Sequence, residues 1–182
     1  GIWLWRRRRA AASLPAVVTI VAAPASPAAW PGWRGFRVAR REYEDRKHTQ
    51  CSFYLEPVDG KALPPFKPGQ FLTFTLRIAD AGAADAGGPR TITRCYSLSD
   101  RPQPTHYRVT IKRVPAPADR PDLPPGVSSG HFHDRVHEGD VLEVKAPSGH
   151  FVVDPEPAVP AVLIAGGIGI TPMMSMLRWS LD

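Results

Sequence analysis

The sequence has 182 residues, 43% of them hydrophobic and 22% charged, which is enough for one ordinary globular domain and part of a second. The formal net charge is +6, but the arginines at positions 6–9 supply four of these charges, so the rest of the chain is close to neutral. Basic and aromatic residues do not alternate along any single segment, which excludes an extended nucleic-acid surface.

Residues 1–32 differ in composition from the rest of the chain, and we interpret them as a basic, Ala/Pro-rich leader or linker. Trp3 and Trp5 adjoin the four arginines, and the apolar run at 14–23 is shorter than the roughly 20 residues that cross a bilayer. Tryptophan beside arginine is typical of the cytoplasmic end of a membrane anchor. A disordered leader explains the same residues equally well, so both interpretations stay open.

Six short segments after residue 33 have the alternating apolar pattern of strands, and turn signals such as Asp59-Gly60 separate them. The alternation is clearest at 71–78. Because almost no helix interrupts the series, the sequence predicts a closed antiparallel barrel. The expected strands are 36–42, 49–58, 71–78, 91–98, 106–114 and 141–145.

The fourth expected strand carries Arg94, Cys95, Tyr96 and Ser97. Alternate residues of a strand point to opposite faces, so Arg94 and Tyr96 share one face while Cys95 and Ser97 share the other. The set suits a ligand that is flat at one end and doubly negative at the other, because arginine binds phosphate, tyrosine packs on a ring and serine bonds a ring nitrogen. FAD fits that description, and an ordinary strand with a surface arginine is the alternative.

One short helix is expected at 130–137, after the segment 126–129. Ser128 or Ser129 would cap its start, and Gly139 would end it. The N-terminus of a helix offers free N–H groups and the positive end of a dipole, which together bind a pyrophosphate. A helix that merely caps the barrel is the alternative.

Three histidines on this helix raise a second possibility, a metal site. His133 and His137 are four residues apart and share a helix face, but His131 points elsewhere and no carboxylate partner is evident. We therefore predict no metal ligands and interpret the three as helix-surface histidines.

Residues 158–182 change the pattern again. The apolar run 161–165 is expected to form a strand buried on both faces, followed by a glycine loop and a helix at 173–181. Thr171 would cap that helix, with Pro172 at its first position. Strand, glycine loop and helix form the opening of a nucleotide-binding α/β unit. One strand and one helix cannot cover a parallel sheet, so we expect the chain to be a fragment.

Three motifs occur in order: Arg94-x-Tyr96-Ser97, then Gly126-x-x-Ser129, then the glycine loop that ends in Thr171-Pro172. With them, residues 33–182 resemble the ferredoxin-NADP reductase superfamily. Within this superfamily, the sequence is similar to the reductase part of flavohaemoglobins and to NAD(P)H oxidoreductases that carry a ferredoxin domain. The resemblance implies a mainly β protein. A six-stranded antiparallel Greek-key FAD-binding barrel with one capping helix would span 33–157, and the first β-α unit of a truncated α/β NAD(P)-binding domain would span 158–182.

The resemblance also implies roles for single residues. Arg94 would pair with an FAD phosphate, Tyr96 would pack on the isoalloxazine ring, and Ser97 would lie near flavin N5. Phe71 stands where flavohaemoglobins have tyrosine, so a ring contact is kept and a hydroxyl contact is lost. The remaining residues would serve the diphosphate, through Lys112, Gly126 and Ser129, and the nicotinamide side, through Gly166, Gly167, Gly169, Thr171 and Pro172.

The implied function is that of a flavin-dependent oxidoreductase module. Hydride would pass from NADH or NADPH to FAD, and electrons would pass on to an iron-sulfur or haem acceptor such as a 2Fe-2S ferredoxin. This step requires no general acid or base, so no catalytic side chain is predicted. The 182 residues alone are expected to bind FAD with little or no NAD(P)H oxidation. The sequence does not separate NADH from NADPH.

Two alternatives remain. The first is the reductase half of a flavohaemoglobin-type nitric oxide dioxygenase, and the second is a non-enzymatic membrane-surface or interaction module, which leaves the glycine loop unexplained. Cys51 and Cys95 stand on separate strands without C-x-x-C spacing, so they predict neither a disulfide framework nor a zinc site. They suit a reducing compartment, and we expect a cytoplasmic protein, at the inner face of a membrane if the leader is an anchor.

Overall fold

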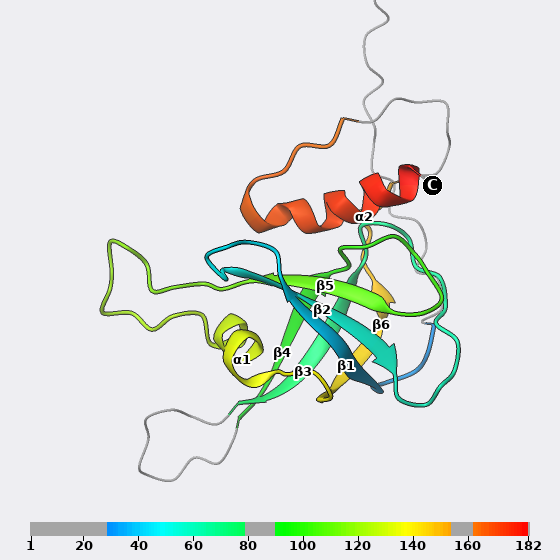
Figure 1. The fold of residues 1–182 in the computed structure, drawn as a ribbon, viewed down its shortest axis with the longest axis horizontal. Coiled ribbons are helices and arrows are strands. Elements are labelled where there is room, and N and C mark those ends of the chain that lie inside the picture. Colours follow the sequence, from blue (N-terminus) through cyan, green and yellow to red (C-terminus); the bar gives the residue numbers. More distant parts are fainter. Residues whose placement is uncertain (1–28, 79–89, 154–161, 182) are drawn as a thin grey trace, which may run out of the picture.

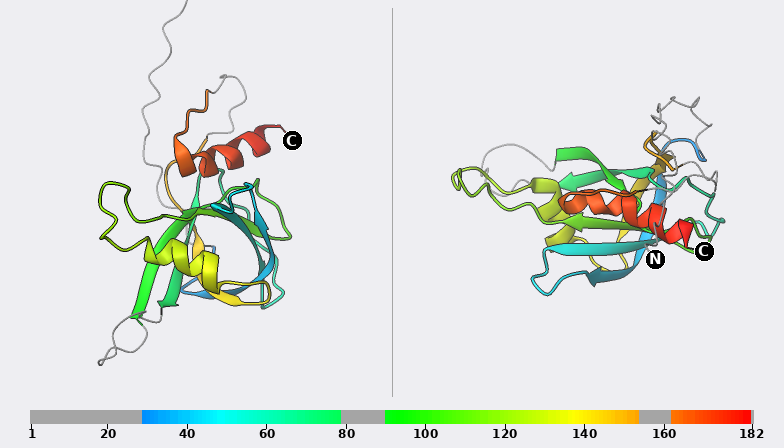
Figure 2. Two further views of the ribbon diagram at one scale, coloured as in Figure 1. Left: turned by 60° about the vertical axis from the view of Figure 1, so that its left-hand side comes forward. Right: turned by 90° about the horizontal axis from the view of Figure 1, so that it is seen from above.

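The computed structural model describes residues 29–78, 90–153 and 162–181. Most of the predicted leader or linker, residues 1–28, lies outside this part of the chain. Six strands and one helix form a barrel-like body, and a second helix lies across its end (Figures 1 and 2). Among the described residues, no helix is long and apolar enough to cross a membrane. The elements are β1 (Arg34–Tyr43), β2 (Gln50–Pro57), β3 (Phe71–Ile78), β4 (Arg90–Ser97), β5 (Tyr107–Lys112), α1 (Val127–Arg135), β6 (Val141–Ser148), the short 3-10 helix η1 (Gly167–Gly169) and α2 (Ile170–Ser180).

The strands form one antiparallel sheet in the order β4-β3-β6-β1-β2-β5. The sheet curls until its two edge strands, β4 and β5, approach each other, where a single bridge joins Leu98 to Val109 (Figure 2). The prediction of a six-stranded antiparallel barrel is confirmed, but the barrel is not fully closed and keeps an open seam between β4 and β5. The N-terminal turn of α1 lies at this seam, where Ser128 bonds Tyr96 of β4 and Ser129 bonds Val114, which follows β5.

Alternate residues of the strands fill the interior, as the sequence pattern predicts. Along β3 the side chains of Leu72, Phe74, Leu76 and Ile78 are buried, while the residues between them are more exposed. Phe132 of α1 is fully buried and packs edge-on against the rings of three strands: Phe53 at 5.3 Å, Phe74 at 5.5 Å and Tyr96 at 5.2 Å. Burial of such a ring contributes about 2–3 kcal/mol, so Phe132 anchors α1 to the barrel.

β5 is buried on both faces, which its alternating sequence does not indicate. Arg108 and Thr110 are only 6% and 8% exposed. Arg108 forms an ion pair with Glu44, and Thr110 lies in a chain of hydroxyl groups between Ser52, at 2.7 Å, and Ser99, at 2.8 Å. These partners satisfy hydroxyl groups and one guanidinium nitrogen that would otherwise be costly to bury, whereas Arg108 Nε is buried without a partner among the described residues.

The start of α1 differs from the prediction. The helix begins three residues earlier than expected, with Gly126 as its N-cap, so Ser128 and Ser129 lie inside the first turn and neither is the cap. The Gly126 N–H donates to the Val114 carbonyl at 2.9 Å, and the Ser129 hydroxyl accepts from the Val114 N–H at 3.1 Å and donates to the Gly126 carbonyl at 3.0 Å. These bonds tie the first turn to the segment that follows β5.

The expected strand at 161–165 is wrong for the part that is described, because residues 162–166 form no strand. Val162 and Ile164 are 84% and 82% exposed. A strand of this type forms when neighbouring strands accept its backbone hydrogen bonds, and no described strand lies beside it. The helix that follows does form, but it begins at Ile170, earlier than expected. Thr171 is its second residue and donates to the Ile168 carbonyl at 3.0 Å.

Candidate functional site

A cavity of about 650 Å³ lies at the open seam of the barrel. The edge strands β4 and β5 form two of its walls, the first turn of α1 forms a third, and the start of α2 closes one end. The lining residues are Arg90, Ile92, Arg94, Cys95, Tyr96, Ser97, Thr110, Ile111, Lys112, Val114, Gly126, Val127, Ser128, Ser129, Ile168, Gly169, Thr171 and Pro172.

The cavity brings the three sequence motifs together, although they lie far apart along the chain. All predicted site residues line it except Phe71, Gly166 and Gly167. From the first motif come Arg94, Tyr96 and Ser97, and from the second Gly126 and Ser129. The rest are Lys112, at the end of β5, and Gly169, Thr171 and Pro172 at the start of α2.

Phe71, Gly166 and Gly167 lie outside the cavity for different reasons. Phe71 begins β3 and pairs with Ser97 and Ser148, and its ring fills the space above Gly149, where a Cβ atom would approach Phe71 Cε1 to 2.9 Å. Gly166 and Gly167 lie at the entrance to η1, and a Cβ atom on either would meet nothing within 4 Å.

The charge of the lining is positive. Arg90, Arg94 and Lys112 line the cavity, and none of its described lining residues is acidic. The first turn of α1 also contains no acidic residue, and its geometry leaves the N–H groups of Val127, Ser128 and Ser129 without an acceptor inside the helix. The positive end of the helix dipole therefore adds to the side-chain charges, and the site favours an anion.

Tyr96 is held from three sides. Its hydroxyl forms a hydrogen bond of 2.8 Å with the Ser128 hydroxyl, and its ring packs edge-on against Phe74 and Phe132, with centroids 5.8 and 5.2 Å away. Burial raises the pKa of Tyr96, although the hydrogen bond from Ser128 and the charge of Arg94 lower it in part. The ring is thus a fixed, neutral, partly apolar surface in the wall of the cavity.

The side chain of Ser129 fixes the first turn of α1 and does not point an unbonded hydroxyl into the cavity. Its hydroxyl is engaged by Val114 and Gly126, so its contribution to an anion site would come from its backbone N–H. The close packing of Ser129 and Val114 leaves room only for glycine at position 126, because a Cβ atom there would lie 2.8 Å from both Ser129 Oγ and Val114 Cβ.

Several residues that line the cavity are not among the predicted site residues. Arg90 and Ile92 precede Arg94 by four and two positions, so the strand alternation that pairs Arg94 with Tyr96 also predicts their face. Nothing local points to Val114, Val127 or Ile168, because they reach the cavity only through the packing of α1 and α2.

The interpretation of the three helix histidines as surface residues is wrong for His133. His133 is 3% exposed, and its Nε2 atom contacts the Ile111 carbonyl at 2.9 Å. His137 lies beyond the last residue of α1, where its Nδ1 atom is 3.1 Å from the Arg135 carbonyl.

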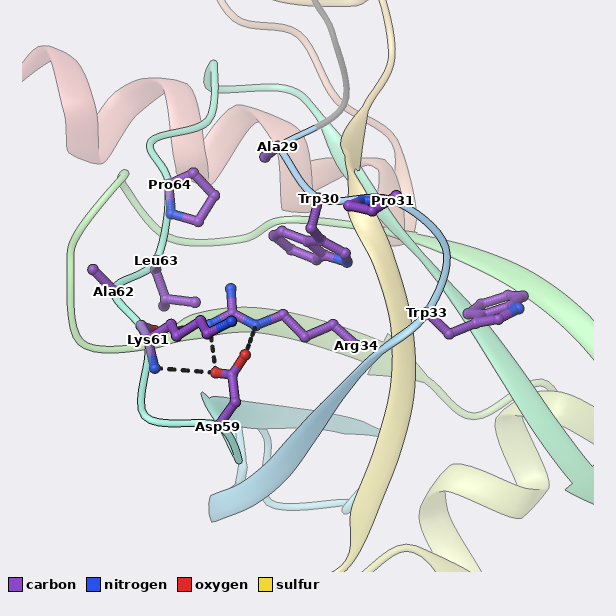
Figure 3. Close-up of a pocket in the computed structure, with 10 residues that line it drawn as sticks. All are labelled: Ala29, Trp30, Pro31, Trp33, Arg34, Asp59, Lys61, Ala62, Leu63 and Pro64. Atoms are coloured by element: carbon purple, nitrogen blue, oxygen red, sulfur yellow. Dashed lines mark hydrogen bonds and ion pairs between the residues drawn. The ribbon is translucent and has the colours of Figure 1, made fainter.

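A second pocket of about 470 Å³ lies where the chain enters β1 (Figure 3). Its wall includes Trp30, which donates to the Val144 carbonyl at 3.2 Å, and Arg34, which binds both carboxylate oxygens of Asp59. The hydrogen bonds from Arg34 hold the pKa of Asp59 below its usual range. This pocket contains none of the motif residues, and its arginine and aspartate already satisfy one another.

The chain is similar to known flavoproteins. No family profile matches it. It is 48% identical over 130 residues to a flavohemoprotein of Halalkalibacterium halodurans, covering 71% of this chain and 29% of that protein, and 40% identical over 145 residues to a flavohemoprotein of Bacillus subtilis, covering 80% and 31%. The chain therefore spans less than a third of the length of these relatives.

Solved structures agree with this similarity. The FAD/NAD-binding domain of a nitric oxide dioxygenase from Vibrio cholerae superposes with a TM-score of 0.67 at 32% identity, covering 80% of this chain and 55% of that one. Phthalate dioxygenase reductase superposes with a TM-score of 0.59 at 34% identity, covering 81% and 39%.

The fold is thus ferredoxin-NADP reductase-like, as the sequence predicts. Within this class, the sequence resembles the reductase part of flavohemoproteins.

Proposed function

We propose that this chain is a flavin-dependent oxidoreductase module that binds FAD at the open seam, takes hydride from NADH or NADPH and passes electrons to an iron-sulfur or haem acceptor. The observation that carries the proposal is the meeting of Arg94, Tyr96, Lys112 and the N-terminus of α1 in one cavity. The similarity to flavohemoproteins and to phthalate dioxygenase reductase supports the same function.

The donor set of the cavity fits FAD. Arg94, Lys112 and the free N–H groups of the first turn of α1 would hold the diphosphate. The fixed ring of Tyr96 would pack on the isoalloxazine, and Ser97 lies next to it on β4 as a hydrogen-bonding group. When bound, the flavin supplies the chemistry of hydride acceptance and electron release, which no side chain of the cavity provides.

The contribution of the chain is to position two ligands. Gly169, Thr171 and Pro172 bring the start of α2 to the same cavity, so we assign them to the nicotinamide side. Thr171 is 7% exposed, and its hydroxyl is fixed by its bond to Ile168, so this end of the site is preformed. Orientation of two reactants in a preformed site lowers the barrier to their reaction.

The first test is the visible absorption spectrum of the purified 182-residue chain after incubation with FAD and removal of the excess. We expect flavin bands in the wild type and their loss, by at least about tenfold in occupancy, in Arg94→Ala, because a charge-assisted phosphate contact contributes about 1.5–3 kcal/mol. Arg37→Ala, an exposed arginine of β1 outside the cavity, is the matched control. A folded wild-type chain that stays colourless would refute the assignment.

Hydride transfer is tested separately. We expect this chain, once loaded with FAD, to oxidise NADH or NADPH slowly or not at all with ferricyanide as acceptor. Rapid turnover would contradict that expectation while supporting the assignment of the flavin site.

The reductase half of a flavohaemoglobin-type nitric oxide dioxygenase is the second candidate, and the 48% identity to a flavohemoprotein favours it. We infer a cytoplasmic location from the two free cysteines, Cys51 and Cys95. Membrane contact through the arginines at positions 6–9 is a separate proposal, tested by co-sedimentation of the chain with anionic vesicles.

A further inference from the structure

Ser128 joins the two ends of the cavity. Its backbone N–H belongs to the first turn of α1, where an anion would bind, and its hydroxyl is bonded to Tyr96, where a ring would pack. We propose that Ser128 is a positioning residue that sets the orientation of Tyr96 against the bound flavin. This inference rests on the proposed function.

The bond between Ser128 and Tyr96 is partly shielded from water. Ser128 is 8% exposed, and the two hydroxyl oxygens are 2.8 Å apart. Rotation of the Tyr96 ring would leave the Ser128 hydroxyl buried without this partner, which costs more than the loss of an exposed hydrogen bond. The bond therefore restricts the ring to one orientation.

Helix α1 holds Tyr96 through two residues of one face. Ser128 and Phe132 are four positions apart, and Phe132 packs edge-on against the tyrosine ring, with centroids 5.2 Å apart and planes at 79°. The ring of Phe132 is itself fixed by Phe53 and Phe74. A shift of α1 would thus move both contacts of Tyr96 together.

The same turn of α1 is fixed to the segment after β5 through Ser129 and Val114. An anion bound at the helix N-terminus would stabilise this turn and, through Ser128, the tyrosine ring. Ser128 occupies a variable position of the Gly126-x-x-Ser129 motif, so the motif alone does not specify the bond.

The test is a double-mutant cycle in the full 182-residue chain, with FAD affinity and the visible circular dichroism of bound FAD as readouts. We expect Ser128→Ala to weaken FAD binding by roughly two- to tenfold, since one partly shielded hydrogen bond is lost, and to change the visible spectrum. Ser128→Thr should restore both properties because it keeps the hydroxyl. Tyr96→Phe should lose as much affinity as Ser128→Ala, and the double variant should lose no more than either.

The control is Ser180→Ala, which removes a helix hydroxyl outside the cavity, one that bonds the Met176 carbonyl. A Ser128→Ala chain that is less stable but binds FAD with unchanged affinity and spectrum would overturn the inference, because it would leave the bond a purely structural role. Strictly additive effects of the two substitutions would also overturn it. If the wild type binds no FAD, the proposed function itself fails. That result differs from one in which the wild type and the Ser128 variants bind FAD equally well, which overturns only the role of Ser128.

Discussion

His133 is a buried side chain with only half of its hydrogen-bonding capacity used. Its Nε2 atom contacts the Ile111 carbonyl at 2.9 Å, so Nε2 carries the proton, while Nδ1 is buried without a partner among the described residues. Burial lowers the pKa of His133, and the nearby charges of Arg113 and Arg41 lower it further. The imidazole is therefore held neutral.

The lowered pKa of His133 makes the stability of the fold depend on pH. A histidine whose pKa is lower in the folded than in the unfolded chain stabilises the fold above its ordinary pKa of 6.5 and loses that contribution as the pH falls. We expect the free energy of unfolding to decrease between about pH 7.5 and pH 5.5, and to decrease less in His133→Gln, whose amide keeps a donor for Ile111. Urea unfolding at the two pH values measures this.

Burial also lowers the pKa values of His131 and His106, so the decrease in the free energy of unfolding of the wild type is the sum of several contributions. The difference between wild type and His133→Gln measures the contribution of His133. An equal pH dependence in wild type and His133→Gln would show that His133 does not contribute.

At the scale of elements, Gly69 occupies a point where three segments meet. Its φ angle is +102°, and a Cβ atom there would lie 2.0 Å from the Phe151 carbonyl oxygen and 2.7 Å from Met176 Cε of α2. The turn before β3, the segment after β6 and the second helix therefore all depend on a residue without a side chain.

We expect Gly69→Ala to lower the free energy of unfolding by about 2 kcal/mol or more, because backbone must move to admit the methyl group. Gly60→Ala is the matched control, since Gly60 also has a positive φ angle, +66°, but open space around it. Its cost should be about 1 kcal/mol, from the backbone conformation alone. Similar losses in the two variants, measured by urea unfolding, would contradict the packing argument.

The sequence predicts strands well where burial alternates and poorly where other forces act. For β3 the predicted and observed bounds are identical, because every second residue is buried. β6 continues to Ser148, beyond the predicted end at Lys145, since Pro147 lies where the register with β3 shifts, and a bulge tolerates proline. The start of α1 depends on bonds to Val114, a tertiary contact that no local pattern indicates.

The candidate site was predictable in its motifs and less so in its geometry. The strand motif, the helix start and the glycine loop, together with Lys112, identify half of the lining residues. The hydrogen bond between Val114 and Ser129 depends on packing between distant segments. The same is true of the Phe71 ring, which lies against Gly149 and outside the cavity. A single sequence contains no signal for either contact.

At the scale of the whole molecule, the cavity touches four elements that otherwise have few direct connections: β4, β5, α1 and α2. A ligand bound there would stabilise the folded chain, because it binds the assembled walls and not the unfolded chain. At a free FAD concentration of about one hundred times its dissociation constant, this linkage amounts to about 2.7 kcal/mol.

We therefore expect the thermal unfolding temperature of the 182-residue chain to rise with FAD concentration, and to rise clearly less in Arg94→Ala over the same range. Adenosine alone serves as the control ligand, since it has no phosphate for the cationic wall. An equal rise with adenosine would contradict the assignment of the diphosphate to this cavity.

The strand order has a consequence for how the protein is made. β6 is the last of the described strands in chain order, yet it lies in the middle of the sheet, between β3 and β1. Before residue 148 is synthesised, the nascent chain can pair β3 with β4, and β1 with β2 and β5, and only contacts near the Leu98–Val109 bridge link the two groups of strands. The sheet is therefore complete only after β6 has emerged, and until then the two groups expose apolar faces to which chaperones bind.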